Sequence, residues 1–132
     1  MAVFTFRDTE RLKKKKSIDQ LFSNGMSFYI HPFKVIWMIN ETEQPSPAQV
    51  LISVSRRVMK RAVDRNRVKR QVRELYRQEK ETIYAYLAEK QRYALIGIVF
   101  TGNEFLPFPV AKEKINLVMA RLLKEFKRNI ER

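Results

Sequence analysis

The sequence contains no cysteine, one histidine and only three glycines in 132 residues. Without cysteine the chain forms no disulfide and offers no thiolate for catalysis or metal binding, which suits a reducing cytoplasm. Three glycines are too few for a glycine-rich phosphate loop, and neither common nucleotide-binding fingerprint occurs. The single histidine, His31, has no second histidine or thiol beside it to complete a metal-binding set. Several familiar kinds of active site are therefore excluded.

Acidic residues and long apolar runs are also scarce. There are 14 acidic residues against 27 basic ones, which gives a formal net charge of +13 and a pI near 10.3. A charge of this size indicates an anionic partner, either nucleic acid or an acidic membrane surface. The longest apolar run, Val35 to Ile39, is too short to span a bilayer. The first residues lack the apolar core of a secretory signal, so we expect a cytoplasmic protein.

Length and composition predict one domain, 1–132. Hydrophobic residues make up 45% of the chain, enough for a genuine core. Periodicity predicts the order helix, strand, strand, helix, strand, helix, which is an α+β fold with helices packed on a small sheet. We expect residues 1–10 to be flexible, ahead of the lysine run at 13–16.

The first half of the chain predicts one short helix and two strands. Ser17 is the expected N-cap of the helix, which ends at Gly25. A strand rich in aromatic and β-branched residues is expected over 28–40, with its regular part beginning near Phe33. A second strand is expected over 49–55. The short polar turn between these strands favours antiparallel pairing of one with the other.

The second half predicts a basic helix, a buried strand and a final helix. The basic helix begins near Asp64 or a few residues earlier and is expected to continue toward Lys90. Residues 93–101 are almost continuously apolar, as in a central strand buried on both faces. The final helix is expected from Val110 to about Ile130. The inward face of the basic helix is formed by Val68, Val72, Leu75 and Tyr76.

The segment from Arg56 to Arg77 has the strongest charge signal. It contains ten basic residues against two acidic ones, so it supplies most of the net charge. Like charges four residues apart destabilise a helix, and solvated helix surfaces usually alternate in sign. A same-sign line therefore indicates a polyanion, with a solvated surface as the alternative. The line has five members at four-residue spacing: Arg61, Arg65, Lys69, Arg73 and Arg77.

Three classes of partner are compatible with this charge: RNA, DNA and an anionic membrane. Reading of DNA bases by a helix over 62–77 usually needs mixed polar side chains, so no DNA partner is expected. The inward apolar stripe is better explained by packing in a domain than by membrane insertion, so no membrane partner is expected. RNA is favoured, either in a dedicated complex or through a general RNA-binding module such as a ribosomal protein.

No catalytic residue and no metal site are predicted in the protein. Carboxylates occur in pairs at Asp8 and Glu10, at 41 and 43, and at 79 and 81. We expect the first two pairs in exposed segments and the third on a polar helix. None has a histidine at ligand spacing. The residues therefore point to binding rather than to chemistry.

Residues 60–74 resemble the signature of the bacterial ribonuclease P protein family. The mark of that family is an Arg-Asn-Arg core followed by an apolar residue, Lys-Arg and a further arginine. Here it stands as Arg65-Asn66-Arg67-Val68-Lys69-Arg70 and then Arg73. The strand at 51–55 with the two arginines after it, and the stretch 11–14 followed by Phe22 and Gly25, are similar to the family as well. The likeness covers most of the chain.

The resemblance implies a fold and a function. The fold would have a four-stranded sheet, one strand more than the periodicity indicates, and a left-handed β-α-β crossover. The protein would be the non-catalytic subunit of ribonuclease P, bound one-to-one to the catalytic RNA that removes the 5′ leader from precursor tRNA. Magnesium ions would be held in the holoenzyme by RNA rather than by the protein.

The resemblance also assigns roles to residues. Arginine suits a phosphate because its planar fork donates two hydrogen bonds at once, and aromatic faces stack bases at about 1–3 kcal/mol each. The residues expected to face RNA are Arg56, Arg57, Lys60, Arg61, Arg65, Asn66, Arg67, Lys69, Arg70 and Arg73. The cleft expected to hold the leader is lined by Ile18, Phe22, Phe33, Ile36, Ser53 and Ser55.

Two departures from the family pattern bear on these roles. Ile18 and Ile36 stand where the family often has aromatic residues, so the grip on the leader is expected to be weaker or shifted. The stretch from Val58 to Arg61 lacks the glycine common at this point and is one residue longer. The match of its basic residues to individual family contacts is therefore left open.

Overall fold

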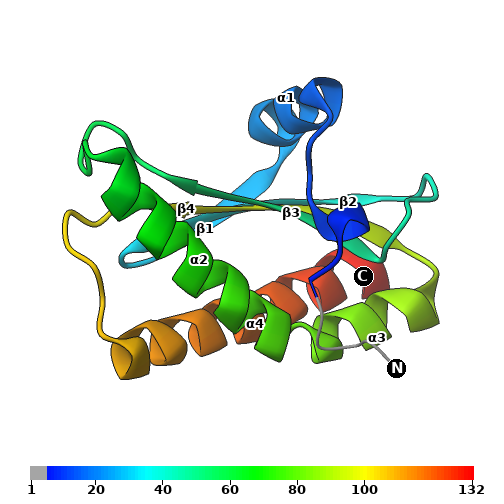
Figure 1. The fold of residues 1–132 in the computed structure, drawn as a ribbon. Helices are drawn as coiled ribbons and strands as arrows, with labels where there is room; N and C mark the ends of the chain where they lie inside the picture. Colours follow the sequence, from blue (N-terminus) through cyan, green and yellow to red (C-terminus); the bar gives the residue numbers. More distant parts are fainter. Residues whose placement is uncertain (1–5) are drawn as a thin grey trace.

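A computed structural model describes residues 6–132 of the chain. It contains a short 3-10 helix, four α-helices and four strands within this range (Figure 1). Their bounds are η1 Asp8–Glu10, α1 Lys15–Asn24, β1 Met26–Ile30, β2 Phe33–Asn40, β3 Ala48–Val54, α2 Ala62–Glu79, α3 Glu81–Lys90, β4 Tyr93–Phe100 and α4 Phe108–Glu131. The predicted α+β class is confirmed, and so is the four-stranded sheet implied by the family resemblance.

The strands lie in the order β1-β2-β4-β3. β1 with β2 and β2 with β4 are antiparallel, whereas β3 and β4 are parallel neighbours joined through α2 and α3. The predicted antiparallel pairing of the segment at 49–55 with the strand before it is therefore wrong. The almost wholly apolar β4 is buried on both faces, and it takes the position between β2 and β3.

The single strand predicted over 28–40 is two strands. His31 and Pro32 form a tight turn with a cis peptide bond, and β1 folds back on β2 from there. Pro32 cannot donate a ladder hydrogen bond, so it fits this turn better than the interior of a strand. The pairing runs from Ile30 opposite Phe33 to Met26 opposite Trp37.

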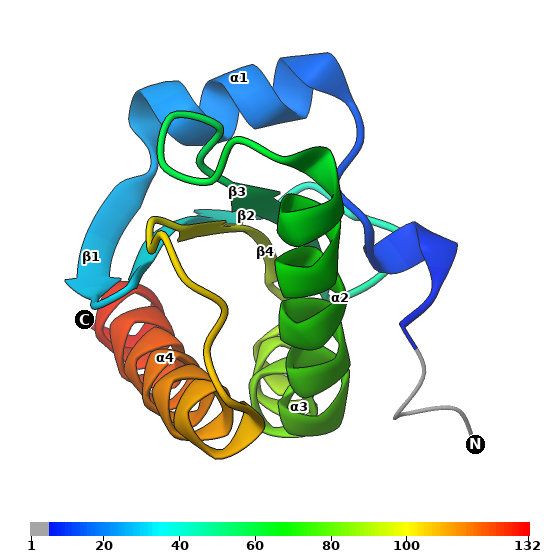
Figure 2. The same ribbon diagram turned by 60° about the vertical axis from the view of Figure 1, so that its left-hand side comes forward.

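The sheet separates two apolar layers of unequal size. Helices α2, α3 and α4 cover one face, and α1 lies on the other (Figures 1 and 2). The larger layer contains Trp37, whose ring centroid lies 5.5 Å from that of Phe126. The smaller layer, under α1, is formed by Leu12, Leu21, Ile36 and Leu95. None of the described helices is long and apolar enough to cross a membrane.

Two helix boundaries differ from the sequence-based expectation. Helix α1 is preceded by Lys14 rather than capped by Ser17, and Lys15 in its first turn pairs with Asp19 at 3.3 Å. The basic helix does not continue to Lys90, because α2 ends at Glu79 and α3 begins two residues later. The inward stripe of α2 is buried as predicted.

The N-terminal segment is held against the domain from Phe6 onward. The flexibility expected for residues 1–10 concerns, in part, residues 1–5, which lie outside the described range; of the remaining residues, Glu10 is 4% exposed. The Glu10 carboxylate pairs with Lys80, the residue between α2 and α3, and accepts a hydrogen bond from the Tyr84 hydroxyl at 2.7 Å. Beyond it, the backbone N–H of Leu12 donates to the Val50 carbonyl at 3.0 Å.

Candidate RNA-binding surface

Helix α2 places its basic residues by burying the opposite face. Val68, Val72, Leu75 and Tyr76 are each at most 2% exposed, so the charged positions between them point away from the sheet. Asn66, Arg67 and Arg70 are exposed, and Lys69 and Arg73 are half-buried. The family motif is thus presented on the outside of a helix that the core holds in place.

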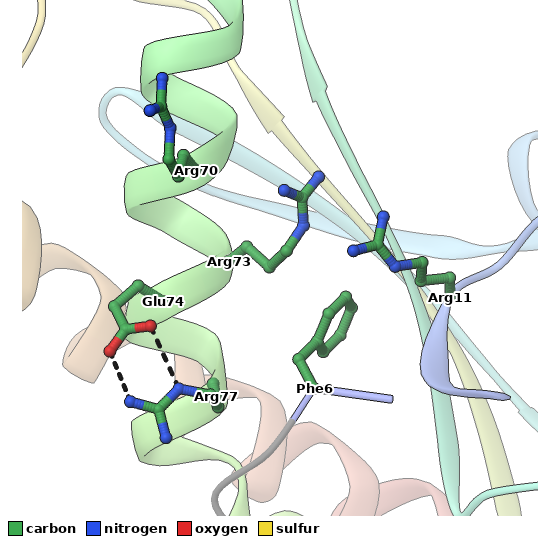
Figure 3. Close-up of a pocket in the computed structure, with 6 residues that line it drawn as sticks. All are labelled: Phe6, Arg11, Arg70, Arg73, Glu74 and Arg77. Carbon is green, nitrogen blue, oxygen red and sulfur yellow. Dashed lines mark hydrogen bonds and ion pairs between the residues drawn. The ribbon is translucent and has the colours of Figure 1, made fainter. Parts of the chain in front are cut away.

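The motif residues face two different sides of α2. The Arg67 guanidinium lies over the ring of Phe105, 3.7 Å from its centroid, so it points toward the loop before α4. Arg73, six residues further on, points to a different side, toward the N-terminal segment (Figure 3). Six residues correspond to about 600° of rotation, which leaves the two positions about 120° apart around the helix axis. An RNA that contacts both would therefore span a broad part of the helix surface.

Arg65 is engaged by the protein itself. Its Nη1 donates to the backbone carbonyls of Met59 at 3.1 Å and Lys60 at 2.6 Å, which closes the loop between β3 and α2. Arg56, Arg57 and Lys60 in this loop are exposed, as is Arg61 at its end. Nothing in the sequence signalled that Arg65 would bind the preceding loop.

The first and last members of the line of five basic residues are paired with carboxylates of α2. Arg61 lies 3.8 Å from the Asp64 carboxylate, and Arg77 donates two hydrogen bonds to the Glu74 carboxylate. Those bonds lower the pKa of Glu74 below its ordinary value and raise the pKa of Arg77. Within residues 6–132, Lys69 and Arg73 of this line form no ion pair with a carboxylate.

Arg73 lies beside a second arginine from far away in the sequence. Figure 3 shows Arg73 and Arg11 extending toward one another above the ring of Phe6. These residues and Arg70 line a surface depression of about 590 Å³. Burial lowers the pKa of Arg73, and the charges of Arg11 and Arg70 lower it further. Sequence reasoning missed Arg11 and Phe6, because only the fold brings them to α2.

The side of the sheet that carries α1 contains four of the six residues predicted for the leader. Ile36 is 6% exposed beneath α1, Ile18 and Ser53 are half-buried, and Phe22 is 46% exposed. Gly97 of β4 allows α1 to approach closely: a Cβ there would lie 3.4 Å from Leu21 Cδ2 and 3.7 Å from Phe22 Cζ. Phe22 therefore stands at the exposed edge of an apolar contact.

Phe33 does not lie with Phe22, and this part of the predicted cleft is wrong. Phe33 is 1% exposed in the larger core, with its ring centroid 5.5 Å from that of Phe100. Successive side chains of a strand point to opposite faces, so Phe33 and Ile36 in β2 cannot share one. Ser55 lies past the end of β3, where its N–H donates to the Phe100 carbonyl at 3.1 Å.

An exposed aromatic residue that sequence reasoning missed lies on the α1 side instead. Tyr29 of β1 is 54% exposed and is paired with Lys34, two residues before Ile36 in β2. Its hydroxyl forms hydrogen bonds with His31 Nδ1 at 2.9 Å and Thr101 Oγ1 at 3.1 Å. The alternation of side chains along the strands could have found Tyr29. Residues opposite each other in β1 and β2 face the same side, so Tyr29 lies on the side of Lys34 and Ile36.

The carboxylates do not form a metal site. In the described part of the chain, no group of three or more histidine or acidic side chains could hold an ion. Asp8 and Glu10 were expected together in an exposed segment, but Glu10 is buried against Lys80. Asp8 is exposed, and its hydrogen bond from Lys13 holds its pKa below the ordinary value.

Comparison with known proteins agrees with this architecture. A family model described as Ribonuclease P matches residues 6–122. The ribonuclease P protein component of Porphyromonas gingivalis is 31% identical over 121 residues, which cover 92% of this chain and 88% of that protein. That of Chlorobium phaeobacteroides is 31% identical over 127 residues, covering 89% and 87%.

Solved structures show the same fold. The ribonuclease P protein of Staphylococcus aureus superposes with a TM-score of 0.70 at 21% identity, covering 86% of this chain and 94% of that one. That of Thermotoga maritima gives 0.67 at 25% identity, covering 85% and 96%. With the basic helix α2 and its Arg-Asn-Arg motif in place, the chain belongs to the family of bacterial ribonuclease P protein components.

Proposed function

We propose that this protein binds the catalytic RNA of ribonuclease P and the 5′ leader of precursor tRNA, and so promotes endonucleolytic removal of the leader in tRNA 5′ maturation. The observation that carries the proposal is helix α2. Its apolar stripe is buried in a family fold, and its Arg-Asn-Arg motif is left facing outward. A stripe of arginines fixed on a rigid helix suits a phosphate backbone better than a diffuse charge does.

The catalytic RNA would be bound by α2 and the loop before it. The residues in this role are Arg56, Arg57, Lys60, Arg61, Arg65, Asn66, Arg67, Lys69, Arg70 and Arg73. Arg65 has one nitrogen committed to the loop carbonyls, so it acts mainly by holding the neighbouring loop residues in place. Arg67 and Arg73 would contact RNA on two different sides of the helix.

The leader would lie on the α1 side of the sheet. Phe22 and Tyr29 offer exposed aromatic faces for unpaired bases, at about 1–3 kcal/mol for each stacked base. Ser53 is a hydrogen-bonding group on the same face. Ile18 and Ile36 contribute to the apolar support under α1. Because base stacking tolerates any base, this surface would accept many leader sequences.

The protein's contribution would be binding and positioning, with the chemistry in the RNA. Among the described residues, no group of three or more histidine or acidic side chains could hold a metal ion for catalysis. Magnesium would be held by RNA phosphates and the substrate, in a cytoplasmic complex with one protein per RNA.

Reconstitution tests the proposal. The purified protein is mixed with a bacterial ribonuclease P RNA at low magnesium, and cleavage of precursor tRNA is followed. Cleavage at the leader junction that requires both components is the expected result, since the protein neutralises phosphates that magnesium would otherwise screen. Tight RNA binding without stimulation would favour a general RNA-binding role. Cleavage by RNA-free protein would contradict the assignment of the chemistry to the RNA.

A further inference from the structure

One depression on the surface is lined by three arginines, Arg11, Arg70 and Arg73, together with the ion pair of Arg77 and Glu74. Arg11 follows η1, whereas Arg70 and Arg73 lie one turn apart on α2. Within residues 6–132, no carboxylate forms an ion pair with any of the three, and the nearby Glu74 is bound to Arg77. The depression therefore concentrates positive charge that the protein itself does not neutralise.

The fold holds this cluster together against its own repulsion. Glu10, directly before Arg11, is buried in an ion pair with Lys80, and Leu12, directly after it, is bonded to Val50 of the edge strand β3. The Phe6 ring supports the cluster from below: the Arg11 guanidinium carbon lies 5.2 Å from its centroid, and its edge packs on Tyr76. Arg11 is thus anchored on both sides in the sequence and supported from below.

We propose that Arg11, Arg70 and Arg73 bind one phosphate group of an RNA backbone, with Phe6 as the floor of the site. Assigning this RNA backbone to the catalytic RNA rests on the proposed function, in which Arg70 and Arg73 belong to the basic surface of α2. A phosphate oxygen between guanidiniums relieves like-charge repulsion and accepts several charge-assisted hydrogen bonds.

The surroundings fit a continuous strand rather than an isolated ion. A second depression of about 200 Å³ shares Phe6, Arg11 and Arg73 with the first and extends to Leu51 on the α1 side of the sheet. A nucleic-acid backbone could follow this path across the edge of β3. Arg11 therefore marks the place where the surface of α2 and the α1 side of the sheet meet.

The test compares Arg11→Gln, Arg73→Gln and the double variant with Arg128→Gln. Arg128 is an exposed arginine near the end of α4, so its loss matches the change in charge. Affinity for a bacterial ribonuclease P RNA is measured with each full-length protein. Each site variant should bind about tenfold more weakly than Arg128→Gln, as expected for a hydrogen bond to a charged group. The double variant should lose much less than the product of the two effects, because both arginines share one phosphate.

Comparing binding of the catalytic RNA with binding of precursor tRNA shows which of the two RNAs supplies the phosphate. A loss confined to leader-bearing precursor tRNA in the assembled holoenzyme would support the site but assign its phosphate to the leader. Binding of both RNAs by Arg11→Gln as tightly as by Arg128→Gln would overturn the inference. Independent effects that multiply to about a hundredfold would overturn the shared phosphate.

A second measurement decides the site even if the proposed function fails. Should the unaltered protein not stimulate cleavage by ribonuclease P RNA, the Nε–H signals of its arginines are followed by NMR during titration with an oligouridylate RNA. Joint shifts of the Arg11 and Arg73 signals, with that of Arg128 unchanged, would support the phosphate site. Unshifted Arg11 and Arg73 signals would overturn it.

Discussion

Replacing Lys80 by methionine should destabilise the protein strongly. The side chains of Lys80 and Glu10 are 4% and 5% exposed, so removing the ammonium leaves a carboxylate buried without its countercharge. Breaking such a pair from one side costs about 3–5 kcal/mol. Glu10 would retain hydrogen bonds from the Tyr84 hydroxyl and the Arg7 N–H, at 2.7 and 2.8 Å, which places the loss near the lower end. The total stability of a domain is only about 5–15 kcal/mol.

Urea unfolding at neutral pH measures this loss. The matched control is Lys112→Met on the exposed side of α4, which should stay within about 0.5 kcal/mol of the parent. The double variant Glu10→Gln with Lys80→Met removes both charges and keeps an acceptor for Tyr84, so it should recover most of the loss. The reasoning is refuted if Lys80→Met lies within 1 kcal/mol of the control, or if the double variant is no more stable than Lys80→Met.

The same substitution should weaken RNA binding at temperatures where the variant is still folded. Release of η1 would free Arg11 from its position beside Arg73, although α2 itself is unchanged. Affinity for ribonuclease P RNA should then fall to about the level of Arg11→Gln. Undiminished affinity in folded Lys80→Met would show that the ion pair does not position Arg11.

Three further changes test other parts of the surface. Replacing Arg65, Lys69 and Arg73 together by glutamine should lower the slope of log affinity against log salt by about 2 units, since Arg65 mainly holds the loop, and an unchanged slope would contradict the assigned contacts. Phe22→Ala should weaken binding of leader-bearing tRNA by about 1–3 kcal/mol more than that of mature tRNA, so equal losses would argue against leader stacking. Burial raises the pKa of Tyr76 and Tyr84 above the ordinary 10.0, so their contribution to stability is complete below pH 10 and is lost as the pH rises further. Unfolding followed between pH 9 and 11 should show this fall, and Tyr84→Phe should reduce it.

Much of the fold was predictable because it depends on local pattern. The apolar stripe of α2, the central position of β4 and the last helix follow from side-chain periodicity over short stretches. The outward face of the α2 motif follows from the same stripe. The errors concern where elements are divided, as at Pro32 and Lys80, and which strands pair, since β3 pairs with β4 instead of with the preceding strand.

The site was predictable in part for the same reason. Phe22 was predicted for the leader cleft and lies on α1, whereas Phe33 was predicted for the same cleft although its position in β2 points into the main core. One residue of register decides the face of a strand, and the turn at Pro32 sets that register. The exposed Tyr29 was missed because the segment over 28–40 was taken as one strand.

Local sequence patterns specify most of the helices and strands, the charge of α2 and the membership of a family, because these depend on residues close together in the chain. The contact of Glu10 with Lys80, 70 residues away, and the resulting position of Arg11 beside Arg73 arise only when the whole chain is folded. Contacts of this kind depend on how helices and strands pack across the whole domain. The local sequence around Arg11, although similar to the family, does not show that Arg11 lies beside Arg73.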